Sequence, residues 1–338
     1  MANIMINEIC NLRCPYCFAD EYVNKEFKEI SLPDFDKALS FALSSGSGER
    51  IGIIGGEPTL HSSFKEIMIK LINDDRVPSV TVFTNGTNIE GIADELCHPK
   101  VHLLINCNSP TNMGAKAFEK MTSNVDCLIN KKHMKDRITL GINMYKPDFD
   151  YMYIVELLEK HGLSSVRTSI SVPNDTDYIQ NPIEYFNKMK PRVLEFFAVL
   201  AKKGIAPFFD CNNMPGCVWT KEERLEALSH YNGADKKTNL FDVSVRCQPV
   251  IDILPDLSII RCFGLSEYTK KNISDFDNID DARNYYIKNI DCFGFNVCHS
   301  EKCQDCYEHS IGKCNGGCFC FSINKILQLR NLANGLNS

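Results

Sequence analysis

Residues 6–20, INEICNLRCPYCFAD, carry three cysteines, Cys10, Cys14 and Cys17, in the spacing C-x3-C-x2-C at the end of the first predicted strand. Three thiolates on one short loop form a set of soft ligands, which favours an iron–sulfur cluster, zinc or copper(I). Three cysteines leave one position of a four-metal cluster without a protein ligand. A structural zinc site needs a fourth ligand, and the next cysteine is the distant Cys97. The loop therefore favours an iron–sulfur cluster with one open position.

The stretch from residue 3 to about residue 172 alternates short apolar runs with longer amphipathic segments, a pattern typical of βα units around a parallel sheet. Six strands are predicted, at residues 4–9, 51–54, 79–83, 101–106, 138–144 and 165–172. Helices are predicted at residues 33–43, 62–73, 89–97, 115–132, 151–161 and 183–203. Functional side chains are expected where the parallel strands end.

A second motif, Gly55-Gly56-Glu57-Pro58-Thr59-Leu60, follows the second predicted strand directly. Glycine lets the backbone approach a ligand closely, and backbone carbonyls with a carboxylate accept hydrogen bonds from an amino group. Gly-Gly followed by Pro also occurs in ordinary turns, so the motif alone is a weak signal. It becomes a strong one because the three cysteines lie upstream of it.

The two motifs together resemble the signature of the radical S-adenosylmethionine (SAM) enzymes, in which aromatic residues such as Tyr16 and Phe18 flank the third cysteine. The resemblance implies a partial (β/α)6 TIM-like barrel, consistent with six predicted βα units. It implies a 4Fe–4S cluster on the three cysteines, with SAM bound to the open iron. It also implies reductive cleavage of SAM to a 5′-deoxyadenosyl radical that abstracts hydrogen from the substrate.

The resemblance also implies SAM contacts at the strand ends. The candidates are Tyr16, Gly55, Gly56, Glu57, Pro58, Thr84, Asn85, Asn106, Asn108, Asn143, Arg167 and Ser169. Asn108-Ser109-Pro110 stands where many relatives have Asp-Gly-Pro, so a neutral amide replaces a charge. Lys116 is the nearest candidate for a basic residue that pairs with the SAM carboxylate. Taken alone, Asn143, Arg167 and Ser169 are explained at least as well as polar turn residues or as inward-facing groups with satisfied hydrogen bonds.

Seventeen cysteines occur in the chain, and seven of them lie between Cys292 and Cys320. No secretion signal is evident, so these cysteines are better interpreted as metal ligands than as disulfides. Cys97, Cys107 and Cys127 are expected to be small buried hydrophobic residues or strand ends.

Residues 247–262 predict a β-hairpin that turns at Pro255-Asp256 and has Cys247 and Cys262 at its two ends. Further along, the pair Cys303 and Cys306 is followed by Cys314, Cys318 and Cys320. Repeated C-x2-C and C-x3-C pairs in one tail indicate metal binding, although cysteine spacing alone does not separate iron from zinc.

The tail resembles the SPASM domain, an extension of certain radical SAM enzymes that holds two auxiliary 4Fe–4S clusters. By this resemblance Cys247, Cys262 and Cys318, with Cys217 as a candidate fourth ligand, hold the first cluster. Cys303, Cys306 and Cys314 hold the second, with Cys320 or Cys298 as the final ligand. Leu257 stands where the SPASM pattern has a glycine, five residues before the second hairpin cysteine.

These patterns predict three parts: a barrel at residues 1–204, a connector at 205–240 with a helix near 221–230, and a SPASM-like α+β domain at 241–338.

Most SPASM enzymes modify ribosomally made peptides, so a peptide maturase that forms a thioether or C–C cross-link is the first hypothesis. The cysteine loop begins at Cys10, so leader recognition would need a separate protein or the surface of the tail. The reductant would be a flavodoxin or ferredoxin. The alternatives are a dehydrogenase acting on an aminosugar or alcohol, and a non-catalytic iron–sulfur scaffold. Residues 55–60 argue against the scaffold, because it needs no SAM site.

The catalytic acid or base is not evident, and Asp210, His230 and Tyr268 are candidates for which a surface role is the simpler interpretation. Sulfatase-maturing relatives have an acidic base where this chain has Phe263, which argues against that activity. A net charge of −6 argues against a nucleic-acid backbone binder. No apolar run approaches the roughly 20 residues of a membrane span, so a cytoplasmic location without a membrane partner is expected.

Overall fold

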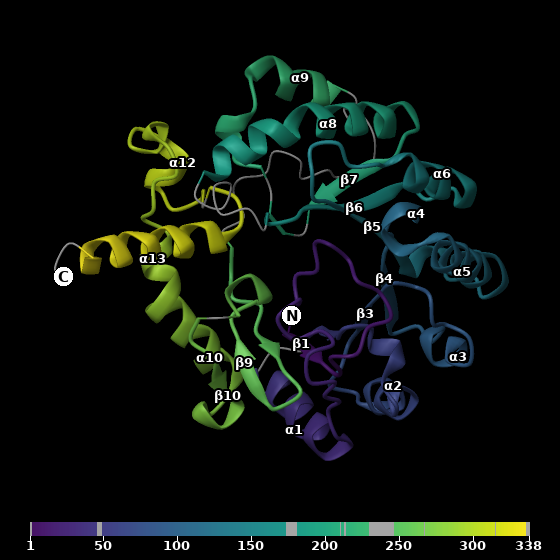
Figure 1. The fold of residues 1–338 in the computed structure, drawn as a ribbon. Helices are drawn as coiled ribbons and strands as arrows, with labels where there is room; N and C mark the ends of the chain where they lie inside the picture. The colour runs from purple at the N-terminus through teal and green to yellow at the C-terminus, as the bar shows by residue number, and fades with distance from the viewer. Residues whose placement is uncertain are drawn as a thin grey trace. The chain divides into compact units, whose positions relative to one another are not determined.

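The computed structural model describes residues 2–45, 49–173, 181–209, 211–212, 214–229, 247–266, 268–314 and 316–335. The chain divides into two compact units (Figure 1). Unit 1 comprises Met1–Gly141 and Pro249–Tyr285, and unit 2 comprises Ile142–Gln248 and Tyr286–Ser338. Within the described residues, no helix combines the length and the apolar character that crossing a membrane requires.

The sheet of unit 1 is built on parallel strands that pair in chain order. These are β1 (Ala2–Met5), β2 (Ile51–Ile54), β3 (Val80–Thr84), β4 (Val101–Asn106) and β5 (Ile138–Met144). Every residue of β2 is buried, as expected for a short apolar strand in a sheet covered on both faces. These strands confirm the predicted mixed α/β fold with a parallel sheet, and their bounds agree with the predicted ones to within a few residues.

Helices connect these strands. They are α1 (Leu32–Ala42), α2 (Phe64–Asn73), α3 (Ala93–Leu96), α4 (Pro110–Met113) and α5 (Ala115–Asp126), which continues as a π-helical turn at Cys127–Lys131. Ser31 caps α1 by accepting a hydrogen bond from the Asp34 amide at 3.2 Å. The helix predicted at residues 89–97 is shorter than expected, because α3 begins only after Ile92, whose side chain cannot cap a helix.

The tail hairpin joins the edge of this sheet. β8 (Asp252–Ile253) pairs antiparallel with β9 (Ser258–Ile260) and parallel with β1, so that Ile253 lies opposite Ile4. With β10 (Lys271–Asn272) the order is β10-β9-β8-β1-β2-β3-β4-β5, and Figure 1 shows β9 and β10 on the β1 side. The predicted hairpin is confirmed, but its pairing with the first strand was not predicted. Leu254, Ile260 and Phe263 pack with Met5 and Ile54 in one core cluster.

Unit 2 contains the end of β5, the strand β6 (Ser165–Ile170) and the strand β7 (Ala206–Phe209). In the sheet β6 lies between β5 and β7, and it pairs with β7 in parallel. Strand β7 lies in the stretch predicted as a connector. Its run contains Pro207, which argues against a strand in the sequence, although proline is tolerated in a strand at the edge of a sheet such as β7. The strand forms where α8 ends at Lys202 and the chain turns back along β6.

The remaining helices are mostly short. They are α6 (Met152–His161), α8 (Pro182–Lys202), α9 (Lys221–Ser229), α10 (Ile279–Tyr286), α11 (Cys292–Gly294), α12 (Tyr307–Ser310) and α13 (Phe319–Gly335). The charged helix predicted near residues 221–230 is confirmed as α9.

Candidate radical cluster site

The loop after β1 holds Cys10, Cys14 and Cys17, each partly buried. Burial raises the pKa of the Cys10 thiol to about 11. Burial, followed by the negative charges of Cys17 and Cys10, raises the pKa of Cys14 to about 12. The three thiols are therefore neighbours in an environment that opposes their ionisation. A bound metal centre would supply the positive charge that thiolates need.

Gly55 and Gly56 bring the end of β2 against this loop. The Gly56 amide donates to the Asn7 carbonyl at 2.9 Å, and the Glu57 amide donates to the Ile9 carbonyl at 2.7 Å. A Cβ atom on Gly56 would lie 2.4 Å from the Ile9 carbonyl oxygen and 3.0 Å from the Cys10 Cβ atom. In this structure the glycines permit a close approach of the backbone to the cysteine loop itself.

Glu57 is 1% exposed and ties the end of β2 to the end of β3. Its carboxylate accepts hydrogen bonds from the Thr84 hydroxyl at 2.6 Å and the Asn85 amide at 2.7 Å. The Thr59 hydroxyl, in the turn formed by Pro58–Leu60, donates a third at 2.6 Å. Burial raises the pKa of Glu57. Because both carboxylate oxygens are already bonded, Glu57 acts on the site mainly by positioning the two strand ends.

Asn85 holds the cysteine loop from the end of β3. Its side-chain amide donates to the Asn11 side chain at 2.8 Å, and Asn11 donates in turn to the Thr87 hydroxyl at 2.8 Å. A further contact comes from Asn24, whose side chain accepts a hydrogen bond from the Cys10 amide at 3.1 Å. Sequence analysis missed Asn11, Asn24 and Thr87. Two of these residues could have been proposed from their positions. Asn11 lies between the first two cysteines, and Thr87 lies in the turn that follows the third strand.

Asn108, after β4, bonds the cysteine loop directly. Its side-chain NH2 donates to the Cys14 sulfur at 3.3 Å, and its oxygen accepts a hydrogen bond from the Tyr16 hydroxyl. An aspartate at this position could not donate to sulfur when ionised. The neutral amide noted in the sequence thus has a physical role in contact with the cysteine loop.

The other predicted SAM contacts are less closely gathered. Asn106 ends β4 opposite Gly141, and Lys116 is exposed in the first turn of α5. In unit 2, Arg167 donates to the Asn143 side chain at 2.8 Å, and Ser169 is buried in β6. These residues stay predictions as SAM contacts. Tyr268 is half-buried after the hairpin, whereas Asp210 and His230 lie outside the described residues.

The hairpin packs on the same cysteine loop within unit 1. Phe263 is 8% exposed, and its ring meets Phe18 edge-on at 5.0 Å and Tyr22 at 5.9 Å. Cys17 also packs against this cluster. The residue after Cys262 therefore lies next to the cysteine loop, although the two segments are far apart in the sequence.

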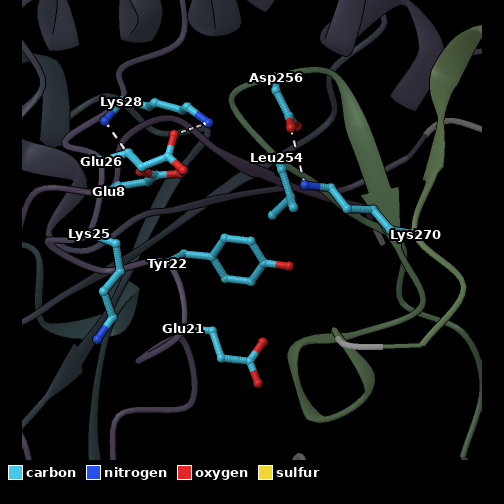
Figure 2. A pocket seen from close by; sticks show the side chains of 9 residues that line it. All are labelled: Glu8, Glu21, Tyr22, Lys25, Glu26, Lys28, Leu254, Asp256 and Lys270. Atoms are coloured by element: carbon cyan, nitrogen blue, oxygen red, sulfur yellow. Dashed lines mark hydrogen bonds and ion pairs between the residues drawn. The ribbon is translucent and has the colours of Figure 1, made fainter.

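A pocket of about 150 Å³ opens beside this packing, between residues that follow the third cysteine and the tip of the hairpin (Figure 2). Its charges are largely paired. Lys270 bonds Asp256 at 3.1 Å, and Lys28 bonds Glu26 at 2.5 Å. Figure 2 shows the Tyr22 ring in the space between these pairs. The pairing leaves the pocket without a clear preference for one class of ligand.

The tail cysteines fall in both units. Cys262 belongs to unit 1, and Cys247, Cys303, Cys306, Cys314, Cys318 and Cys320 belong to unit 2. Burial, with smaller contributions from the charges of Cys217, Cys306 and Cys303, raises the pKa of Cys314 to about 11. The grouping of Cys247 with Cys262 and Cys318 stays a prediction.

The donor chemistry of the cysteine loop fits a 4Fe–4S cluster. Among the described residues, no three His, Cys, Asp or Glu side chains are grouped tightly enough to hold a metal ion as they stand. The fit rests on three neighbouring, partly buried thiols that a cationic centre would deprotonate, and on the Asn108 amide that donates to one of the sulfurs.

Comparison with known proteins is consistent with this geometry. Residues 4–152 match the radical SAM superfamily. A curated relative, the GTP 3',8-cyclase of Psychromonas ingrahamii, is 26% identical over 238 residues, which are 70% of this chain and 62% of the relative. This chain thus spans less than two thirds of that relative's length.

The solved structures of SuiB from Streptococcus suis are similar in fold. SuiB bound to S-adenosylmethionine is 16% identical with a TM-score of 0.62, over 94% of this chain and 72% of SuiB. SuiB bound to the precursor peptide SuiA is 15% identical with a TM-score of 0.59, over 94% of this chain and 71% of SuiB. The likeness to SuiB is one of fold and covers 94% of this chain.

Proposed function

Because this chain carries a radical SAM domain at residues 4–152, we propose that it is an oxidoreductase that cleaves SAM reductively and modifies a ribosomally made peptide. Cys10, Cys14 and Cys17 would hold the 4Fe–4S cluster. When bound, the cluster and SAM supply a 5′-deoxyadenosyl radical that abstracts a hydrogen atom from an unactivated C–H bond. The modification would be a thioether or C–C cross-link.

The observation that carries the proposal is the attachment of the cysteine loop to three strand ends. Gly56 contacts the loop beside Cys10, Asn85 bonds Asn11, and Asn108 bonds Cys14. These contacts position the thiols at the carboxyl ends of parallel strands, where active sites of such barrels lie. A structural metal site would have no need for this connection to three successive strand ends.

The peptide substrate is supported by the likeness to SuiB, which has been solved with a precursor peptide, over 94% of this chain. The second candidate is radical chemistry on a small molecule, such as dehydrogenation of an aminosugar or alcohol. The 26% identity to GTP 3',8-cyclase favours this second candidate. The pocket in Figure 2 favours neither a peptide nor a small molecule, because its charged side chains are largely paired with one another.

Further parts of the proposal concern cofactors and partners. The tail would hold one or two auxiliary 4Fe–4S clusters, and a flavodoxin or ferredoxin would supply electrons. The leader of the peptide would be recognised by a separate protein or by the surface of the tail. Cysteines that serve as metal ligands suit a reducing compartment, so we place the protein in the cytoplasm.

The test is anaerobic incubation of the reconstituted protein with SAM, a reductant and the candidate peptide encoded beside its gene. We expect 5′-deoxyadenosine and a peptide that has lost two hydrogen atoms, both absent in Cys14→Ala. Cys97→Ala, outside the cysteine loop, is the matched control and should retain both products. Nucleoside formation with an unchanged peptide would reject the peptide substrate, and absence of the nucleoside would reject SAM cleavage.

A further inference from the structure

Asn108 lies in a short segment of unit 1 that is fixed on both sides. The amide of Cys107, just before it, donates to the Gly141 carbonyl at 2.8 Å and so continues the pairing of β4 with β5. Ser109, just after it, caps α4, and its side chain accepts a hydrogen bond from the Asn112 amide at 3.3 Å. The Asn108 side chain, which is 3% exposed, therefore projects from a well-anchored backbone.

The contacts of this side chain decide which of its ends faces the Cys14 sulfur. The side-chain nitrogen lies 3.3 Å from that sulfur, and the side-chain oxygen accepts a hydrogen bond from the Tyr16 hydroxyl. A thiolate bound to iron carries no proton, so it can only accept a hydrogen bond, and the NH2 group is the sole donor of an asparagine side chain. Hydrogen bonds therefore run from the Tyr16 hydroxyl through the Asn108 amide to the Cys14 sulfur.

The sulfur of Cys10 accepts an N–H donor of a different kind. The backbone amide of Leu12 donates to it at 3.4 Å. Every residue except proline supplies a backbone amide, so this contact does not depend on the side chain at position 12. The contact of Cys14 depends on the side chain at position 108, and a substitution there can remove it without changing the backbone of the cysteine loop.

An N–H donor on a ligand sulfur changes how easily an iron–sulfur cluster is reduced, because hydrogen bonds to the sulfurs are among the factors that set its reduction potential. One electron from the reductant adds one negative charge, part of which falls on the thiolate sulfurs. The dipole of the Asn108 amide stabilises that charge. Because Asn108 is buried, the dipole acts at a lower effective dielectric constant than that of water, which strengthens its effect.

We propose that Asn108, oriented by Tyr16, raises the reduction potential of the cluster on the cysteine loop by donating a hydrogen bond to the Cys14 sulfur. The inference rests on the proposed function, because it presupposes a 4Fe–4S cluster on the three loop cysteines. Asn108 is in this role a positioning residue that acts through Cys14. The role differs from the SAM contact that the sequence predicts for Asn108 and Tyr16, and it operates without SAM.

The test is a reductive titration of the reconstituted full-length protein without SAM, at alkaline pH, followed by EPR. The signal of the loop cluster is the one that disappears when Cys10, Cys14 and Cys17 are all alanine. We expect a lower midpoint potential in Asn108→Leu, which removes the donor, and a still lower one in Asn108→Asp, which also adds a negative charge. Thr111→Asp is the matched control, because it adds the same charge at an exposed position of α4, where solvent screens it, and it should keep the wild-type potential.

Tyr16→Phe tests the role of the tyrosine hydroxyl. Its loss frees the Asn108 amide to rotate, so the midpoint potential should fall, but by less than in Asn108→Leu. In the Asn108→Leu background the same change should have no further effect, because Tyr16 acts through Asn108. An equal shift in both backgrounds would overturn the orienting role of Tyr16.

A second measurement detects the hydrogen bond itself. In protein labelled with heavy nitrogen at asparagine alone, pulsed EPR of the reduced loop cluster should show a nitrogen coupling that Asn108→Leu lacks. Iron is counted in every variant, and if Asn108→Leu fails to load, the labelled wild type is compared with Asn108→Asp instead. A wild-type potential in Asn108→Leu, or a fall in Asn108→Asp alone, would overturn the inference and leave SAM cleavage untouched. Absence of the loop-cluster signal from the wild type would reject the proposed function as well.

Discussion

At the scale of single residues, Gly56 is the position where the site tolerates change least. Its missing side chain gives room to the Ile9 carbonyl oxygen, and backbone cannot move aside as a flexible side chain can. We expect Gly56→Ala to displace Cys10 and abolish stable loading of the cysteine loop. The measurement is iron content in a variant with serine at the tail cysteines.

Gly55→Ala is the graded comparison for this prediction. Its Cβ atom would meet the Asn7 side-chain oxygen at 2.3 Å, but its nearest backbone atom, the Asn7 carbonyl oxygen, would be 3.0 Å away rather than the 2.4 Å found at Gly56. This variant should load the loop better than Gly56→Ala. Equal loading of both variants would show that the close approach to Ile9 does not position Cys10.

Leu257 is a residue whose backbone explains a departure from the SPASM pattern. Its φ is 64°, the left-handed region that glycine adopts freely and that costs other residues roughly 1–2 kcal/mol. The pattern has glycine at this position, and in this hairpin leucine takes a backbone conformation that glycine adopts freely. The physical requirement is therefore on the turn, and the leucine meets it at a cost in free energy.

We predict that Leu257→Gly is more stable than Leu257→Ala by about 1 kcal/mol in urea unfolding. Both variants lose the half-buried side chain, so their difference reports the backbone alone. Equal stability of the two variants would mean that residue 257 carries no backbone strain.

At the scale of elements, the pairing of β8 with β1 buries a titratable group. Asp252 lies opposite Asn3, whose side-chain amide donates to its carboxylate at 2.7 Å. Burial raises the pKa of Asp252 from 3.8 to about 7. The carboxyl group therefore binds its proton more tightly in the folded chain than in the unfolded chain.

Since the folded pKa is raised, stability should fall as the pH rises from about 4 to about 7, where only the unfolded chain readily releases the proton. The rise in the pKa of Asp252 from 3.8 to about 7 corresponds to a change of at most roughly 4 kcal/mol in the free energy of unfolding. We expect urea unfolding at pH 4.5 and 7.5 to show a smaller pH dependence in Asp252→Asn than in the wild type. A matched control is Asp281→Asn on the exposed face of α10, which should leave the pH dependence unchanged. An unchanged profile in Asp252→Asn would show that Asp252 ionises normally.

The elements also show where sequence patterns stop being informative. Strands β2, β4 and β5 match their predicted bounds because each is a local apolar run. Strand β7 was missed because its run contains Pro207, which argues against a strand, and α3 was overextended because its amphipathic pattern continued into a turn. The hairpin was predicted from its own residues, but its partner β1 lies about 250 residues away and leaves no local trace.

At the scale of the whole molecule, the metal inventory is the property to measure. Three 4Fe–4S clusters would give about twelve iron atoms per chain after anaerobic reconstitution. A value near eight iron atoms would mean that one auxiliary cluster is absent. Zinc bound by the tail cysteines would mean that neither auxiliary cluster forms. The matched comparison is the variant without the three loop cysteines, which should lose about four iron atoms and no more.

The amino-acid sequence by itself determined the order of the βα units and the three-cysteine loop. Both depend on local information: hydrophobic periodicity within each element, and thiols held near one another by a few covalent bonds. Tertiary structure alone decided what holds the loop, because its partners Asn85 and Asn108 lie 74 and 94 residues from Asn11 and Cys14. Hydrogen bonds over such separations follow from strand register, which no local pattern encodes.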